Sequence, residues 1–153
     1  MCVPLSGSRA RTLPQSWAAL PLFADVESAL SELWSAGYKL GVLTNCDDDL
    51  FEQINRHFRE RFDLVVTAES VGDYKPSLSH LTHFSRLSRV APADWVHVAC
   101  SWFHDLLPAR DLGIARIWLD RDLTGEDPSA ATRRLTSAAD LARTVKQLRE
   151  ATK

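Results

Sequence analysis

Apolar residues recur along this chain in two patterns, one typical of amphipathic helices and one typical of short buried strands. The first helical pattern follows Asp25, which we interpret as its N-cap, and it ends at Gly37. Its apolar positions are Val26, Ala29, Leu30, Leu33 and Trp34. The apolar run 40–44 comes next and predicts a strand.

The same alternation continues through the rest of the chain. Further strands are predicted at 64–66, 95–99 and 115–119, and further helices at about 47–58, 78–88, 105–112 and 137–148, with a polar loop at 120–131. Short apolar strands separated by amphipathic helices indicate right-handed βαβ units. We therefore expect an α/β fold, a Rossmann-like parallel sheet with helices on both faces.

Length and composition bound the class of protein. The 153 residues fit one domain, and the 45% hydrophobic and 25% charged fractions exclude a disordered chain. A formal net charge of -2 argues against a nucleic-acid partner, and no apolar run approaches the ~18 residues of a membrane span. We expect a poorly ordered leader over 1–16 and a single domain over 17–150.

The cysteines and the first residues bear on the cellular compartment. Cys2, Cys46 and Cys100 are an odd number of widely spaced thiols, which fits neither a disulfide framework nor a zinc site. The first 20 residues contain no apolar run long enough for a signal peptide. A cytoplasmic location is therefore predicted.

Polar residues follow the predicted strands, where ligands bind in parallel sheets. They are Thr44, Asn45, Lys75, Ser101 and Asp105. If they converge, Lys75 supplies a charge for an anionic substrate and Asp105 orients its ammonium group. The spacing alone leaves an alternative open, in which these residues form only turns, a solvated loop and a helix N-cap.

Three segments, taken in order, resemble the haloacid dehalogenase (HAD) superfamily of hydrolases, and most closely its 2-haloacid dehalogenase-like branch. They are Leu40–Asn45, Tyr74–Ser77 and His97–Asp105, supported by Gly37–Lys39 and by Pro108–Gly113. The resemblance covers roughly residues 17 to 148 and implies a hydrolase of small anionic substrates.

The resemblance implies a role for each matching residue. Thr44 and Asn45 would hold the substrate, with Ser101 as a third substrate-binding residue. Lys75 would neutralise the nucleophile and the developing anion, and Asp105, in the same loop as Ser101, matches the second acid of the fourth motif. The first acid of that motif is replaced by Cys100, and a neutral thiol is a poor ligand for magnesium. We therefore expect no metal site and no cofactor, although the resemblance does not exclude magnesium.

The first motif of the family, a strand ending in Asp-x-Asp with the nucleophile, has no match in this sequence. Asp25 opens a helix and cannot take this role, and residues 1–16 contain no acid. In the family this strand lies centrally, between the strands expected at 40–44 and 95–99. The chain thus resembles the carboxyl-terminal portion of such a hydrolase, without the nucleophile strand and most of the cap domain.

Two hypotheses about function follow, and the sequence leaves open whether the chain alone is an enzyme. The first is a hydrolase portion whose aspartate nucleophile is supplied by another segment or chain. The second is a catalytically inactive remnant that serves as a binding or interaction module. In either case, strand edges without partners predict self-association.

Overall fold

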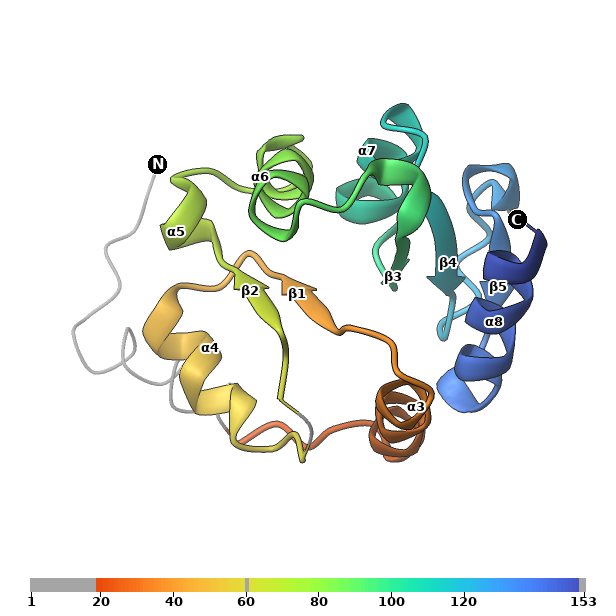
Figure 1. Ribbon diagram of the computed structural model, residues 1–153, viewed down its shortest axis with the longest axis horizontal. Coiled ribbons are helices and arrows are strands. Elements are labelled where there is room, and N and C mark those ends of the chain that lie inside the picture. The colour runs from red at the N-terminus through yellow and green to blue at the C-terminus, as the bar shows by residue number, and fades with distance from the viewer. Residues whose placement is uncertain (1–18, 60, 152–153) are drawn as a thin grey trace, which may run out of the picture.

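The computed structural model describes residues 19–59 and 61–151, in which helices alternate with parallel strands (Figure 1). The strands are β1 (Gly41–Leu43), β2 (Leu64–Val66), β3 (Val96–Ala99), β4 (Ala115–Leu119) and β5 (Arg133–Leu135). Their pairing is parallel throughout, so the predicted α/β class is confirmed. The leader expected over 1–16 lies outside the described residues.

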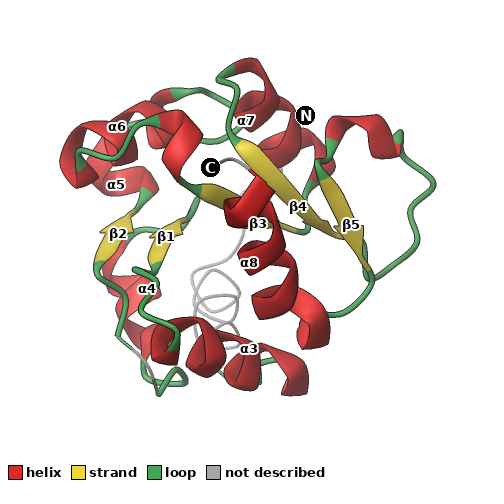
Figure 2. Ribbon diagram, turned by 45° about the vertical axis from the view of Figure 1, so that its right-hand side comes forward, coloured by secondary structure: helices red, strands yellow, loops and turns green. Residues whose placement is uncertain are grey.

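Helices lie before, between and after these strands (Figure 2). They are α3 (Ala24–Ser35), α4 (Asp48–Asn55), α5 (Ala68–Val71), α6 (Ser79–Ser88), α7 (Leu107–Asp111) and α8 (Leu141–Ala151). Short 3₁₀ turns occur at Pro92–Asp94, Pro128–Ala130 and Ala138–Asp140, and a π-helical turn, η2, at Trp102–Leu106. No helix in the described part of the chain is long and apolar enough to cross a membrane.

The strands form two separate sheets. One contains β1 and β2, with Val42 opposite Val65, and the other has the order β3-β4-β5, with Val98 opposite Ile117. The ladders that the structure describes do not join β1 to β3, and Figure 1 shows the two sheets side by side. Each of these two strands therefore pairs on one side only among the described residues.

The main core lies between the three-stranded sheet and the helices α3 and α8, which are far apart in sequence. Leu33 of α3 packs with Ile117 of β4 and with Val145 of α8. A smaller cluster joins the two sheets, because Leu81 of α6 packs with Ala109 of α7 and both contact apolar side chains near β1 and β3. Apolar packing thus holds α3 to the three-stranded sheet, although α3 directly precedes β1 in sequence.

Asp25 does not have the predicted capping role. Phe23 precedes the helix, and the Asp25 carboxylate lies in the first turn, where it accepts no capping hydrogen bond. It accepts instead two hydrogen bonds of 2.9 Å from the Arg121 guanidinium, and one of 2.7 Å from each of Ser137 Oγ and the Ala138 N–H. The carboxylate therefore joins α3 to the carboxyl-terminal segment.

Two other parts of the fold differ from the sequence prediction. The helix expected at 105–112 is a π-helical turn that begins at Trp102, followed by α7. Strand β5 follows the loop predicted at 120–131, and the sequence pattern did not indicate it. Its sequence, Arg133-Arg134-Leu135, lacks the apolar alternation that normally marks a strand. Among the described residues β5 pairs with β4 alone, so it lies at an edge of the sheet, where charged side chains are common.

Candidate active site

Lys75 lies where the carboxyl ends of the two sheets meet. Its ammonium nitrogen donates to the Leu43 carbonyl oxygen, 3.0 Å away at the end of β1, and to Asp105 Oδ1, 2.8 Å away in η2. The side chains of Lys75 and Asp105 are only 14% and 8% exposed. A sheltered ion pair therefore connects the loop after β2 to the segment after β3.

Asp105 receives a second hydrogen bond on the same oxygen. The ring nitrogen Nε2 of His97, a buried residue of β3, lies 3.1 Å from Asp105 Oδ1. Burial by itself would raise the pKa of Asp105, but the hydrogen bond from His97 and the charge of Lys75 outweigh it. The pKa of Asp105 thus lies below its ordinary value, and the group is a carboxylate at neutral pH.

Asn45 holds the backbone of Lys75. Its Oδ1 accepts a 2.8 Å hydrogen bond from the Lys75 N–H, and its Nδ2 donates to the Lys75 carbonyl oxygen at 3.2 Å. The loop between α5 and α6 is thereby tied to the end of β1. Asn45 therefore lies beside Lys75 as expected, but both polar atoms of its side-chain amide are bonded to the Lys75 backbone.

Thr44 occupies the end of β1, with its backbone fixed on both sides. Its N–H donates to the Val66 carbonyl, and its own carbonyl accepts from Nε2 of His80 at 3.1 Å. His80 is fully buried, and burial lowers the pKa of its imidazole. The Thr44 hydroxyl oxygen accepts a 3.2 Å hydrogen bond from the Cys46 N–H. In the described part of the chain the hydroxyl donates to no acceptor, so its hydrogen is available to a ligand.

Ser101 acts as the cap of η2. Its hydroxyl oxygen accepts from the His104 N–H at 3.1 Å and lies 2.9 Å from the His104 ring nitrogen Nδ1. Ser101 follows β3 directly, so it borders the same edge as Asp105, and its hydroxyl is already used locally. His104 is therefore a local hydrogen-bonding partner of Ser101.

The acidic and thiol groups at this edge do not suit a magnesium ion. Burial raises the pKa of the Cys100 thiol despite the nearby Arg121 charge, so the sulfur stays protonated at neutral pH. Asp105 Oδ1 is occupied by two nitrogen donors. Within residues 19–59 and 61–151, no group of three His, Cys, Asp or Glu side chains is placed to hold a metal ion.

Sequence reasoning missed two histidines that contact site residues. His97 interrupts an otherwise apolar strand, and the sequence analysis gave its side chain no role. A polar residue whose strand neighbours are apolar was the available signal, since a buried polar group needs a partner. His80 gave no comparable signal, because it lies in a mixed helical pattern.

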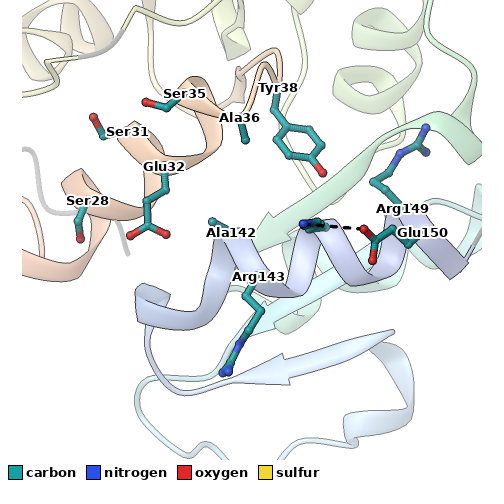
Figure 3. A pocket seen from close by; sticks show the side chains of 11 residues that line it. Ser28, Ser31, Glu32, Ser35, Ala36, Tyr38, Ala142, Arg143, Arg149 and Glu150 are labelled. Carbon is teal, nitrogen blue, oxygen red and sulfur yellow. Dashed lines mark ion pairs between the residues drawn. The ribbon is translucent and has the colours of Figure 1, made fainter.

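A surface groove of about 1020 Å³ lies away from this edge, between α3 and α8 (Figure 3). Serines and Tyr38 line one side, and Arg143, Lys146 and Arg149 line the other. Lys146 is paired with Glu150, and Arg143 with Asp140. None of the five residues predicted for the site borders this groove.

Comparison with known proteins gives consistent matches. The sequence model for haloacid dehalogenase-like hydrolases matches residues 11–119. The chain is 35% identical over 100 residues to "haloacid dehalogenase-like hydrolase domain-containing protein 3" of Xenopus laevis, covering 65% of this chain and 40% of that protein. It is 30% identical over 129 residues to a phosphoserine phosphatase of Thermus thermophilus, covering 80% and 52%.

Solved structures have the same fold at low sequence identity. An L-2-haloacid dehalogenase from Xanthobacter autotrophicus superposes with a TM-score of 0.78 at 19% identity, covering 94% of this chain and 69% of that one. A HAD phosphatase from Thermococcus onnurineus gives 0.72 at 22% identity, covering 86% and 62%.

The described chain thus spans about half the length of the curated relatives named above. The family match covers most of its residues and includes both strands that lead into the site, β1 and β3. The chain belongs to the haloacid dehalogenase-like hydrolases.

Proposed function

We propose that this chain forms the carboxyl-terminal portion of a HAD-like hydrolase that cleaves a small anionic substrate. The observation that carries the proposal is the sheltered Lys75–Asp105 ion pair, which joins the ends of both sheets. An ion pair that only stabilised the fold would not need to lie at the ligand-binding edge of a sheet. This one is bonded to the Leu43 carbonyl at the end of β1, directly before Thr44, at the edge where parallel sheets bind ligands.

The roles of the side chains follow from their hydrogen bonds. Lys75 uses two of its three N–H bonds on Leu43 and Asp105, so the third is available for an anion. The Thr44 O–H supplies a second donor for a substrate oxygen. Asn45 and Ser101 border this position, and we propose that they complete the substrate pocket. Lys75 would act catalytically by stabilising negative charge as it develops, and Asp105 by holding the Lys75 ammonium charged and oriented.

The nucleophile in this proposal is an aspartate on a strand that binds between β1 and β3. A carboxylate attacks the substrate carbon or phosphorus, expels the leaving group, and is released from the covalent intermediate by water. The Lys75 ammonium lies beside β1 and near β3, so it would neutralise both the attacking carboxylate and the departing charge. We propose that this reaction proceeds without magnesium, in keeping with the poor ligand set at Cys100 and Asp105.

Strand complementation tests the proposal. The 153-residue chain is mixed with a synthetic peptide, an apolar strand ending in Asp-x-Asp, and hydrolysis of a 2-haloacid and of a phosphate ester is measured. We expect no turnover by the chain alone and measurable turnover with the peptide. The matched controls are a peptide with Asn in place of the first Asp, and the chain carrying Lys75→Ala.

The outcomes separate clearly. Turnover that requires both the peptide aspartate and Lys75 supports the proposal. Turnover by the purified chain alone that is lost in Lys75→Ala would show that a nucleophile already exists in it. Peptide binding without any turnover would favour the second hypothesis.

That second hypothesis, a non-catalytic interaction module, is favoured by one specific observation. Among the described residues, β1 and β3 each carry backbone groups on one side without a ladder partner. Such edges pair with strands of other chains. We therefore expect self-association and a melting temperature below the usual range of ~45–65 °C. Light scattering tests this, and a monomer with a sharp transition at high temperature would contradict it.

The proposed setting is the cytoplasm. The two described cysteines, Cys46 and Cys100, are free thiols. A reducing compartment keeps thiols in this state.

A further inference from the structure

We infer that His97 is a positioning residue that fixes Asp105 and, through it, the ammonium group of Lys75. This inference rests on the proposed function, in which Lys75 contacts the substrate. Within the described residues His97 bonds Asp105 and makes no hydrogen bond to Lys75, so its action on the ammonium is through Asp105.

The contacts define a linear chain of groups. His97 Nε2 lies 3.1 Å from Asp105 Oδ1, and Lys75 Nζ lies 2.8 Å from the same oxygen. All three side chains are largely buried, with 8% exposure for His97 and Asp105 and 14% for Lys75. One carboxylate oxygen of Asp105 is thus contacted by a group from β3 and by one from the loop after β2. Strands β3 and β2 belong to different sheets.

The protonation of the His97 ring follows from this geometry. An ionised carboxylate has no hydrogen to give and only accepts. Asp105 pairs with the Lys75 ammonium at 2.8 Å and its pKa is lowered despite burial, so it is ionised at neutral pH. His97 must therefore carry its hydrogen on Nε2 and donate it to Asp105.

Asp105 needs a second donor to keep one orientation. It lies in a π-helical turn, and the terminal torsion of an aspartate is broad. With Lys75 as its only partner, the carboxylate could rotate with the flexible four-carbon stem of the lysine. His97 is held on a paired strand, with Val96, His97 and Val98 in register with β4. A rigid element therefore sets the position of the carboxylate, and the carboxylate sets the position of the ammonium.

The alternative is that His97 only fills space beside Trp95, whose ring centroid lies 6.4 Å from that of His97. Two amide variants distinguish these roles. In His97→Gln the amide nitrogen reaches about as far as Nε2, so a donor to Asp105 is retained. In His97→Asn the side chain is shorter and the donor is lost. His83→Gln, on the exposed face of α6, is the matched control.

Three measurements are made on the full chain. Long-range ¹H–¹⁵N spectra of the wild type report which ring nitrogen of His97 carries the hydrogen. Titration of the Asp105 carboxyl ¹³C signal reports the state of the carboxylate in each variant. Calorimetry with inorganic phosphate reports how well the Lys75 ammonium receives an anion.

We expect Nε2 to be protonated in the wild type. In His97→Asn we expect the Asp105 midpoint to rise and phosphate binding to weaken roughly tenfold, the size of one lost hydrogen bond. His97→Gln and His83→Gln should stay close to the wild type in both measurements.

The inference is overturned if Nε2 is unprotonated, or if the Gln and Asn variants behave alike. The ring-nitrogen measurement needs no substitution, so it decides even if His97→Asn fails to fold. Failure of the proposed function looks different. In that case the wild type binds no phosphate, while the ring nitrogen and the Asp105 titration still report whether His97 holds the carboxylate.

Discussion

The three-stranded sheet and the two-stranded sheet are stabilised in different ways. Around β3, β4 and β5 the core is continuous and apolar, with Ile117 fully buried between α3 and α8. Around β1 and β2 fewer apolar side chains are fully buried, and hydrogen bonds from polar side chains fix the loops that follow these strands. Asn45 ties the loop at Lys75, and Thr67 caps α5 and also bonds Asp48.

This difference explains the location of the candidate site. Catalytic charges need defined positions, and the polar ties of the two-stranded sheet position Thr44 and Lys75. His97 belongs to β3 of the three-stranded sheet, and Asp105 lies in η2, which follows that strand. The site therefore combines one partner fixed by packing with another fixed by hydrogen bonds.

The largest loss of stability is expected from a substitution that creates a cavity beside the three-stranded sheet. Ile117→Ala removes a fully buried side chain and should lower the free energy of unfolding by about 2–5 kcal/mol. Val42→Ala, at a half-buried position of β1, should cost only about 1 kcal/mol. Urea unfolding of both variants measures the difference. Equal losses would mean that the two sheets contribute equally to the core.

A smaller loss is expected when the link between α3 and the carboxyl-terminal segment is removed. Asp25→Asn weakens the hydrogen bonds from Arg121 and Ser137 and should cost about 2–3 kcal/mol at pH 7. Glu32→Gln, an exposed position on the same helix, is the control and should change stability little.

The same variant also changes the response to acid. Hydrogen bonds from Arg121 and Ser137 hold the pKa of folded Asp25 below the ordinary 3.8. Its contribution is therefore fully present above that value and is lost as the pH falls toward the folded pKa. Between pH 4 and pH 2, roughly, Asp25→Asn should lose less stability than the wild type. Parallel losses would show that Asp25 does not supply this part of the acid sensitivity.

Removing the cap of helix α5, which follows β2, should have a still smaller effect on the free energy of unfolding. Thr67→Ala removes the capping hydrogen bond to the Ser70 N–H and should cost about 1 kcal/mol. Amide hydrogen exchange should accelerate in α5 and leave β4 unchanged. Faster exchange in both regions would mean that the two sheets open together rather than separately.

No effect is expected from magnesium. Addition of the ion at low millimolar concentration should leave the melting temperature unchanged, because Cys100 is a protonated thiol and Asp105 is engaged by two nitrogen donors. Thermal shift assays with and without magnesium measure this. A saturable shift that disappears in Asp105→Asn would contradict the metal-independent proposal.

Much of the fold follows from local pattern, because short apolar runs such as 64–66 and 115–119 match strands β2 and β4 residue for residue. The proximity of Lys75 and Asp105 follows from the rule that parallel strands end at one edge. Contacts set by tertiary structure were not predictable in the same way. Asp25 looks like a helix cap in sequence, yet its partner Arg121 lies 96 residues away.

The packing of α3 against α8 also sets an order for folding during synthesis. The apolar cluster around Leu33 of α3 includes Leu40 nearby in sequence, but it is completed only by side chains of β4 and of residues from Ala138 onward. Until those residues leave the ribosome, the apolar face of α3 has only part of its native partners, while β1, β2 and α6 emerge in between. The nascent chain therefore keeps this helix incompletely buried until α8 is made, a period in which exposed apolar surface invites chaperone binding.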